Sequence, residues 1–484
     1  MKINFMSLEN IKSDRIKKLQ ALKDREIDPY PAKTGNHLPI GKVLEDFENI
    51  SKSEESVDLA GRLKRERKHG GSFFADLEDE SGLIQIYFKK DELGEDLYRE
   101  ASDLFDAGDF VKVSGKLFAT HKGEKTLLVK SFCLLAKAIN QLPDKWHGLK
   151  DVEERFRRRY LDLAMNKEVF ERFKKRGEII KKIREFLEKE GFLEVETPVL
   201  QPLPGGALAK PFKTHLNALD MDLYLRVSPE LYLKRLLVGG FEKVYELGRC
   251  FRNEGMDKSH NPDFTMLEFY WAYADYEQLM ELTEKMFVSL IPEKEIEFQG
   301  HKISAKTPFK RISMRDLILE EYKIDIDLAS KEELIDCLKS AGEKIGDDIP
   351  GCKIIDEIFK TIRPRIIEPT FVINHPLEMS PLAKANPKNP REAARFQLLI
   401  AGMEMVNAYC ELNDPQEQAK RMKQQEEHRG DEERQRFDED FVEALEYGMP
   451  PAAGFGMGID RLVMLLTDTP VIREVILFPT MREK

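Results

Sequence analysis

The sequence predicts an α+β protein, with a small N-terminal β-barrel followed by a larger domain built on an antiparallel β-sheet flanked by helices. The chain has 484 residues, which exceeds what one hydrophobic core covers, so two or three domains are expected. Residues 56–138 contain five short β-rich runs. Residues 244–276 contain two longer β-rich runs on either side of a polar loop.

The five N-terminal runs alternate with turn residues. They read VDLAGRL, SFFADLED, LIQIYF, DFVKVSGKLF and KTLLVKSFCLLAKA, and a helical piece is expected near Glu92 to Phe105. This pattern predicts a Greek-key barrel of the OB type. Such barrels commonly bind single-stranded nucleic acid and use aromatic side chains as stacking platforms.

The segment Val244 to Tyr276 is expected to form an antiparallel pair of strands around a polar loop, residues 253–263. On the second strand Glu268 and Tyr270 are two residues apart, so they share a face, while the intervening apolar residues point the other way. Taken alone, this segment is better explained as an exposed hairpin with a solvated, charged tip.

A second strand pattern lies near the C-terminus, in EMVNAYCELND. Asn407, Tyr409 and Glu411 alternate there with apolar residues, so three polar side chains share one face. The segment GFGMGIDRLVMLL is expected to be a glycine-rich turn that runs into an apolar helix carrying Arg461. Its three glycines permit close backbone approach to a ligand.

The remaining segments set the domain boundaries. Residues 1–55 form an N-terminal helix and lead-in, 56–138 the barrel, 139–165 a charged linker, and 166–484 the larger domain, with an insertion at about 291–365. Within the larger domain, a helix is expected from about Lys167 to Glu190, and Gly191 ends it.

Composition points to a cytoplasmic protein without a membrane segment. No run of 18 apolar residues occurs, and the N-terminus lacks the apolar core of a signal peptide. The five cysteines never form a C-x-x-C pair, which fits a reducing compartment. The net charge of −11 does not favour binding of nucleic acid, whose phosphates need Lys and Arg. Basic clusters at 62–68, 155–159 and 174–176 could bind phosphates locally, or they could be solvated surface charge.

Together and in this order, three motifs resemble those of the class II aminoacyl-tRNA synthetases. FLEVETPVLQ, with Pro198, is similar to the first motif, FRNEG with the following HNPDF to the second, and GFGMGIDR to the third. Within that class, GGALAKPF, YLRVSPELYLKRLLVGG, NPDFTMLEFYWAYADY and NAYCELNDP are similar to the lysyl-tRNA synthetases. The resemblance runs from about Ser13 to Lys484.

The resemblance implies a ligase that joins L-lysine to ATP as lysyl-adenylate and then passes lysine to the 3′ end of tRNA(Lys), with Mg²⁺ as cofactor. The implied catalytic residues are Arg252, Glu404 and Arg461. The implied ATP-binding residues are Arg252, Glu254, His260, Phe264, Glu404, Gly458 and Arg461. The implied metal ligands are Glu404 and, as a weaker ligand, Gln397, whose neutral amide stands where relatives usually carry a carboxylate.

The resemblance also implies a lysine pocket that is rich in carboxylates. A buried ammonium without partners is very costly, so a lysine pocket needs carboxylates. The implied lysine-binding residues are Gly206, Glu230, Glu268, Tyr270, Asn407, Tyr409 and Glu411. Tyr409 stands where a phenylalanine is frequent, and Ser259 where many relatives carry an arginine.

For the barrel, the resemblance implies an anticodon-binding surface made by Arg67, Phe74, Gln85 and Glu124. Phe74 would stack on a base while Gln85 and Glu124 read a base edge. The first motif, residues 192–201, is expected to lie in the two-fold interface of a homodimer.

Three other functions stay open at this point. One is a sister enzyme of the same class that charges aspartate or asparagine, although such a pocket should carry Arg or Lys at its distal end. Another is a non-catalytic nucleic-acid-binding paralogue that kept the fold. The third is lysine transfer to a protein acceptor, which is known for shorter relatives that lack the barrel.

Overall fold

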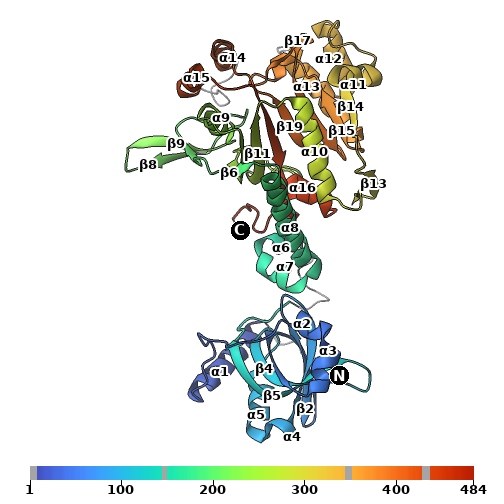
Figure 1. Cartoon of the computed structure of the whole chain (residues 1–484). Helices are drawn as coiled ribbons and strands as arrows, with labels where there is room; N and C mark the ends of the chain where they lie inside the picture. The colour runs from blue at the N-terminus through green and yellow to red at the C-terminus, as the bar shows by residue number, and fades with distance from the viewer. Residues whose placement is uncertain (1–7, 144–148, 150, 344–350, 428–436, 484) are drawn as a thin grey trace. The chain divides into compact units, whose positions relative to one another are not determined.

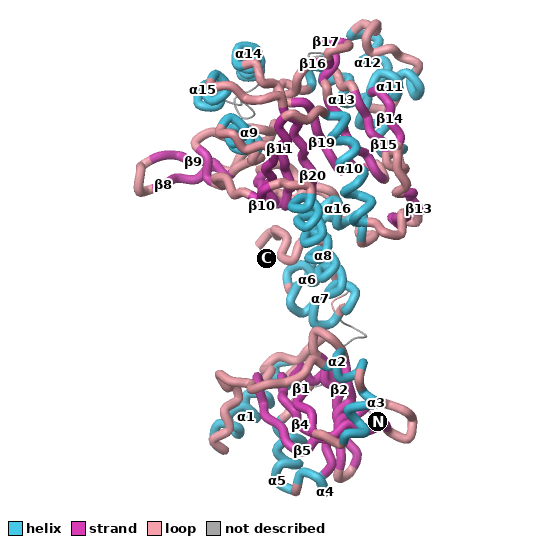
Figure 2. The backbone as a smooth tube through the Cα atoms, in the orientation of Figure 1, coloured by secondary structure: helices cyan, strands magenta, loops and turns pink. Residues whose placement is uncertain are grey.

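The computed structural model describes residues 8–143, 149, 151–343, 351–427 and 437–483. The chain divides into two compact units, residues 1–149 and 150–484, and each is described by itself. Figure 1 labels the helices and strands, and Figure 2 distinguishes them by colour.

The first unit is a closed five-stranded barrel with helices packed around it. Its strands follow the order β1-β2-β3-β5-β4, which confirms the predicted OB-type fold. The strands are β1 (Ser56–His69), β2 (Ser72–Glu78), β3 (Leu83–Lys89), β4 (Phe110–Ala119) and β5 (Lys125–Ala136). The helices are α1 (Leu8–Asp24), α2 (Ile40–Glu45), α3 (Phe47–Ser53), α4 (Lys90–Leu93) and α5 (Glu95–Leu104).

Burial alternates along β2, which fixes the face that each aromatic residue presents. Phe73 is buried in the barrel core, whereas the next residue, Phe74, is half-buried on the outer surface. Phe74 is therefore not a core residue, and its ring is accessible from outside the barrel.

The second unit is built on an eight-stranded sheet in the order β14-β15-β18-β19-β20-β11-β10-β6. The two end pairs, β14 with β15 and β10 with β6, are parallel, and the other neighbours are antiparallel. The strands are β6 (Leu193–Glu194), β10 (Lys243–Phe251), β11 (Asp263–Ala272), β14 (Lys310–Ser313), β15 (Thr370–Ile373), β18 (Arg395–Ile400), β19 (Met403–Cys410) and β20 (Ala452–Gly458).

Helices cover both faces of this sheet. On one face α8 (Lys167–Lys189), α10 (Tyr276–Leu290) and α16 (Ile459–Leu466) share a core with sheet residues such as Phe269 and Val406 (Figure 1). On the other face α9 (Glu230–Val238) and α15 (Glu439–Glu446) pack around Tyr270. The predicted division of β11 into a polar and an apolar face is confirmed, because Phe269 and Tyr270 belong to different clusters.

Several smaller elements also belong to the second unit. Strands β7 (Leu200–Gln201), β8 (Lys213–Leu216) and β9 (Met221–Leu225) form a separate sheet. Strands β16 (Ala385–Asn386) and β17 (Asn389–Ala393) form a hairpin, and α14 (Pro415–Glu427) follows β19. Short 3₁₀ turns lie at Arg363–Arg365, Leu377–Met379 and Ile472–Glu474.

The predicted insertion at about 291–365 is partly integral to the sheet. It contains the hairpin β12 (Glu295–Phe298) and β13 (His301–Ser304), and helices α11 (Met314–Tyr322), α12 (Lys331–Ser340) and α13 (Gly351–Ile362). The same range also supplies edge strand β14, and its helices share a core with sheet residues Val372 and Leu399.

The glycine-rich segment before α16 is a strand and not the expected turn. Residues 452–458 form β20, which lies between β11 and β19 near the middle of the sheet. Neighbouring side chains fill the space above its glycines Gly454 and Gly456, so the absence of Cβ atoms serves packing within the sheet.

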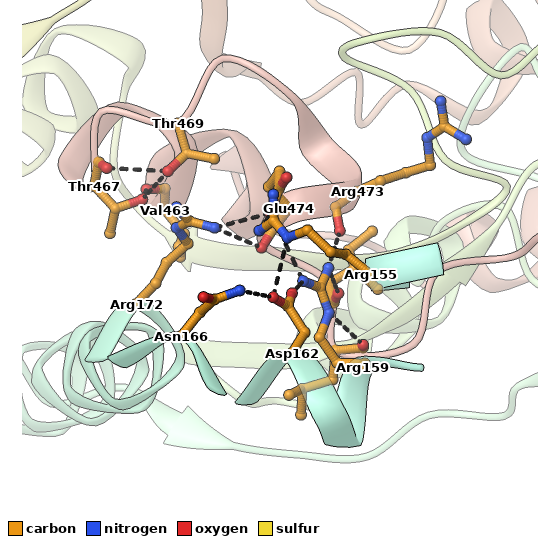
Figure 3. A network of polar contacts seen from close by, with 12 residues as sticks. Arg155, Arg159, Asp162, Asn166, Arg172, Val463, Thr467, Thr469, Arg473 and Glu474 are labelled. Atoms are coloured by element: carbon orange, nitrogen blue, oxygen red, sulfur yellow. Dashed lines mark hydrogen bonds and ion pairs between the residues drawn. The ribbon is translucent and has the colours of Figure 1, made fainter. Parts of the chain in front are cut away.

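The predicted linker 139–165 extends less far than expected, because α6 (Val152–Arg157) and α7 (Arg159–Met165) belong to the second unit. Arg159 is fully buried and donates to Asp162 Oδ2 at 2.6 Å and to the Arg473 carbonyl at 2.9 Å. Arg155 pairs with Asp162 and, at 3.2 Å, with Glu474 (Figure 3). This part of the basic cluster at 155–159 is thus an internal network that ties α7 to the C-terminal segment.

Candidate active site

A cavity of about 350 Å³ opens on the polar side of the second unit. It is lined by the loop between β10 and β11, by β19 and β20, and by the start of α16. All seven residues that were expected to bind ATP line it, namely Arg252, Glu254, His260, Phe264, Glu404, Gly458 and Arg461. Three of the expected lysine-binding residues also line it, namely Gly206, Asn407 and Tyr409.

Arg252 and Phe264 form one wall of the cavity, at the ends of β10 and β11. The Arg252 guanidinium carbon lies 5.1 Å from the centroid of the Phe264 ring. The buried Nε of Arg252 has no hydrogen-bond partner within the described residues. A buried donor without a partner fits a site that an anionic ligand would complete.

Arg461 on α16 forms a second cationic position. Its Nη1 donates to the Glu404 carbonyl at 3.1 Å, and its Nη2 lies 3.0 Å from His260 Nε2. His260 Nδ1 lies 2.9 Å from Asp257 Oδ2, so the neutral tautomer that donates to Asp257 leaves Nε2 free to accept from Arg461. Burial alone would raise the pKa of Asp257, but the Ser259 backbone N–H and His260 hold it at about 2.

The Glu404 carboxylate fits a magnesium ion that takes its other ligands from phosphates and water. Its side chain lines the cavity and lies 3.7 Å from the Arg363 guanidinium. Within the described ranges, no group of three or more His, Cys, Asp or Glu side chains is placed to hold a metal. Magnesium in nucleotide sites commonly uses one or two carboxylates together with substrate phosphates, so one carboxylate suffices.

Gln397 lies outside the set of residues that line the cavity. It is buried on β18, opposite Asn407, and its Oε1 lies 3.2 Å from His375 Nε2. Burial holds the pKa of His375 well below its usual value, so its imidazole is neutral and donates this bond. The Gln397 amide is thus already engaged, and of the two expected metal ligands only Glu404 lines the cavity.

The other expected lysine-binding residues are buried, and Glu230 among them contacts Gly206 and Tyr409, which line the cavity. Glu268 and Tyr270 on β11 are joined, because the Tyr270 hydroxyl donates to Glu268 Oε2 at 3.1 Å. The Ser228 hydroxyl donates to Glu268 Oε1 at 2.6 Å. Two neutral hydroxyl groups therefore hold the Glu268 carboxylate in position.

Glu230 and Glu411 belong to the same cluster but have a different partner. The Tyr409 hydroxyl donates to Glu230 Oε1 at 2.8 Å, and Lys234 Nζ donates to the same oxygen at 2.6 Å. The Lys234 ammonium also forms a close ion pair with Glu411 Oε2. Glu411 Oε1 has no hydrogen-bond partner among the residues described.

Burial and nearby negative charge raise the pKa values of two of these carboxylates, Glu268 and Glu411. Burial, reinforced by the negative charge of Glu230, raises the pKa of Glu268 to about 8. Burial also raises the pKa of Glu411 well above its usual value, although Lys234 opposes this shift. An incoming ammonium would reverse both shifts by pairing with the carboxylates.

Two glycines make room for these carboxylates. A Cβ on Gly454 would lie 2.0 Å from Glu411 Oε1 and 2.5 Å from Tyr270 Cε1. Gly206 has a φ of +85°, and a Cβ there would lie 2.7 Å from the Glu230 Cβ. Larger residues at either position would push the cluster apart.

Sequence reasoning missed four residues of this site, namely Ser228, Lys234, Arg363 and Arg395. Arg395 Nε donates to Asn407 Oδ1 at 2.8 Å and so orients that amide at the cavity wall. Lys234 lies one helical turn after Glu230, and this spacing could have suggested the pair. The other contacts join distant segments and give no local signal.

The expected anticodon-binding residues lie in the first unit. Arg67, Phe74 and Tyr87 are paired across β1, β2 and β3, and the Phe74 and Tyr87 rings stack at 4.3 Å. Glu124 is exposed. Gln85 is buried, and its Oε1 accepts from the Thr126 hydroxyl at 3.1 Å.

The fold and the cavity define a class of protein. A largely antiparallel sheet that presents Arg252, Phe264 and Arg461 to one cavity is the arrangement expected of a class II tRNA synthetase. The sequence profile of the family described as "tRNA synthetases class II (D, K and N)" matches residues 151–482, and that of "OB-fold nucleic acid binding domain" matches residues 57–135.

Relatives that are similar over nearly the full length narrow the class. The chain is 50% identical to a lysine–tRNA ligase of Carboxydothermus hydrogenoformans and 49% identical to one of Moorella thermoacetica, with 97% of each chain covered in both cases. It is 47% identical to a lysine–tRNA ligase of Roseiflexus sp. (strain RS-1), with 99% of this chain and 100% of the relative covered. The chain belongs to the lysine–tRNA ligase family of the class II synthetases.

Proposed function

We propose that the protein activates L-lysine with ATP to lysyl-adenylate and transfers the lysyl group to the 3′ end of tRNA(Lys). The observation that carries this proposal is the group of three buried carboxylates, Glu230, Glu268 and Glu411, of which Glu230 contacts the lining of a cavity that arginines also line. Such a group needs cationic partners, and lysine brings two ammonium groups.

In the first step an oxygen of the lysine carboxylate attacks the α-phosphorus of ATP, and pyrophosphate leaves with the electrons of the broken P–O bond. Because the substrate itself is the nucleophile, the protein positions the reactants and neutralises charge. Arg252 would hold the α-phosphate and the lysine carboxylate, and Arg461 the γ-phosphate. Phe264 would stack on adenine, and the loop that carries Glu254 and His260 would cover the nucleotide.

Magnesium would be held by Glu404, the ATP phosphates and water, and it would supply positive charge between the phosphates. Two contacts of Glu404 support this proposal. Arg461 donates to the backbone carbonyl of Glu404, and the Arg363 guanidinium lies near the Glu404 carboxylate. Lysine itself would be bound through its ε-ammonium by Glu268 and Glu411, with Tyr270 beside them. Its α-ammonium would be held by Glu230 and the Gly206 carbonyl, its stem would pack on Tyr409, and its carboxylate would be oriented by Asn407.

In the second step the terminal ribose hydroxyl of the tRNA attacks the carbonyl carbon of the mixed anhydride, and AMP leaves. The barrel would select the tRNA through its anticodon, with Phe74 as the stacking platform beside Arg67, Gln85 and Glu124. The presence of the barrel favours tRNA over a protein as the lysine acceptor.

The site favours neither the charging of aspartate or asparagine nor a non-catalytic role. A pocket for aspartate needs a cation at its distal end, and here the Lys234 ammonium is already engaged by two carboxylates. A non-catalytic paralogue has no need of the arrangement that places Arg252, Glu404 and Arg461 together in one cavity.

We also propose that the protein is a homodimer with the first motif in its two-fold interface. Leu193 and Leu200 of that motif are 51% and 45% exposed, with Val199 exposed between them. A second copy would cover these apolar side chains. Sedimentation at micromolar concentration should give a dimer, and a monomer under those conditions would contradict this.

The cytoplasm is proposed as its location, because tRNA charging supplies the ribosome and the five cysteines are free. No helix within the described segments is long and apolar enough to cross a membrane.

The test of the proposed function is ATP–pyrophosphate exchange with each amino acid in turn, followed by charging of tRNA(Lys). Exchange should depend on lysine, and radiolabelled lysine should then appear on tRNA(Lys). Exchange that depends on aspartate or asparagine, or no exchange with any amino acid, would contradict the proposal.

A further inference from the structure

Lys234 is a buried lysine within the cluster that is proposed to bind the substrate lysine. It lies on α9, its side chain is 0% exposed, and its Nζ contacts both Glu230 and Glu411. The rings of Tyr409 and Phe441 enclose the ammonium, with centroids 5.7 Å and 5.9 Å away. A buried ammonium with two carboxylate partners and two aromatic neighbours is a built position and not an incidental contact.

We propose that Lys234 is a specificity-determining residue of the amino-acid pocket, whose fixed ammonium engages Glu230 and one oxygen of Glu411, so that the remaining charge of the cluster matches the two ammonium groups of one lysine. This inference rests on the proposed function and adds a residue to its substrate pocket.

The charges of the cluster support this assignment. Glu230, Glu268, Glu411 and Lys234 are all buried, and they carry a net charge of −2 when all are ionised. Two ammonium groups on the ligand balance that charge, whereas a neutral side chain would leave carboxylates buried without a counter-charge. Arg252 and Asn407, which face the cavity, are available for the substrate carboxylate.

Two carboxylates of the cluster keep the capacity to bind a further ammonium group beside that of Lys234. Glu411 Oε1 has no hydrogen-bond partner within the described part of the chain, although its other oxygen contacts Lys234. Glu268 accepts from the hydroxyl groups of Ser228 and Tyr270, which leave its charge uncompensated. Glu268 and Glu411 are therefore the carboxylates whose charge Lys234 does not fully neutralise, and they are the two that are proposed to bind the ε-ammonium.

Without Lys234, Glu230 and Glu411 would be like charges buried together with Glu268. Buried carboxylates that share a site without a cation take up protons, which removes the negative charge that distinguishes an ammonium from a methyl group. Loss of Lys234 should therefore lower the preference of the pocket for lysine over a neutral side chain of the same length.

The experiment compares L-lysine with L-norleucine, which has the same side-chain length but lacks the ammonium. For the wild type, Lys234→Met and Lys234→Gln, kcat/KM for each amino acid is measured by ATP–pyrophosphate exchange, together with KM for ATP. Lys234→Gln serves as the second variant, because its amide keeps a polar group in the buried position. In both variants the ratio of kcat/KM for lysine to that for norleucine should fall at least about tenfold, while KM for ATP stays within about threefold.

Arg235→Met is the matched control. Arg235 is the next residue on α9, and its guanidinium pairs with Asp438, 3.1 Å away, outside the carboxylate cluster. This variant removes a cation from the same helix and should leave the lysine-to-norleucine ratio unchanged.

Three outcomes would overturn the inference. Equal losses of kcat/KM for lysine and norleucine, which leave the ratio unchanged, would show that Lys234 only supports α9. Wild-type kcat/KM for both amino acids in both Lys234 variants would show that its charge plays no part in selection. A fall of the ratio in Arg235→Met as large as in Lys234→Met would show a general effect of net charge. Failure of the proposed function is a separate result, in which the wild type itself does not prefer lysine.

Discussion

The binding surfaces proposed for the two units are built in opposite ways, one exposed and one buried. On the barrel, Arg67 is 56% exposed and the stacked rings of Phe74 and Tyr87 lie half-buried on the outer face. In the second unit, Glu268 and Glu411 are 3% and 1% exposed. A flat aromatic surface tolerates many partners and gains moderate energy from each stacked base. A buried carboxylate tolerates only a matching cation, so its removal should cost more and should affect one substrate alone.

The largest effect is expected from Glu411→Gln, which removes a buried charge from the proposed lysine pocket. Lysine activation should fall by about 2–4 kcal/mol in kcat/KM, while KM for ATP changes little. Amino-acid-dependent ATP–pyrophosphate exchange measures both quantities. Glu443→Gln, at an exposed position on α15, is the control and should match the wild type. Equal losses of ATP and lysine affinity would assign Glu411 to the fold instead.

A smaller effect is expected from Phe74→Ala on the barrel. Charging of tRNA(Lys) should weaken by about 1–3 kcal/mol, because a stacking platform is lost, and exchange without tRNA should be unaffected. Phe110→Ala is the matched control, because Phe110 is an exposed phenylalanine of the same barrel that stacks against Arg62. Similar losses in both variants would indicate a general effect on the barrel.

A change in pH should affect the two sites differently. The pKa of Glu268 is raised to about 8 in the free pocket by burial and by Glu230, so the carboxyl is largely protonated below that value. Lysine requires the ionised form, so KM for lysine should fall as the pH rises from about 7 to 8.5, by less than about tenfold per pH unit. KM for tRNA should not follow this profile. A KM for lysine that is flat over this range would contradict the assignment of Glu268.

The smallest effect is expected from Gln397→Glu. Gln397 is engaged by His375 behind the cavity, so the Mg²⁺ concentration for half-maximal exchange should stay within about twofold of the wild-type value. Glu404→Gln, tested alongside, should nearly abolish exchange. A clear fall in the Mg²⁺ requirement of Gln397→Glu would instead place residue 397 at the metal.

Much of this architecture could be predicted from local patterns. The alternation of polar and apolar residues on β11 and β19 predicts which side chains face the site, since strand periodicity needs no tertiary information. The end of α8 was likewise predictable. Gly191 has a φ of +85°, and the following residue, Phe192, donates to the Leu187 carbonyl at 3.0 Å in a C-terminal cap.

The failures concern contacts between distant segments. Arg363 and Glu404 are in contact although β15 and β18 lie between them in the sequence, and no spacing in the sequence marks this contact. Arg159 resembles solvated charge in the sequence, but the C-terminal segment buries it. Glycines at 454–458 resemble a turn, but they form a strand paired with β11 and β19, in which Glu411 and Tyr270 occupy the space that a Cβ on Gly454 would need.

The most direct test of the difference between the two units measures exchange and tRNA charging side by side for Phe74→Ala and Glu411→Gln. We predict that Phe74→Ala keeps wild-type exchange and loses charging, and that Glu411→Gln loses both in equal proportion. Loss of exchange in Phe74→Ala, or full charging in Glu411→Gln, would contradict the roles proposed for the exposed surface of the barrel and the buried carboxylates of the second unit.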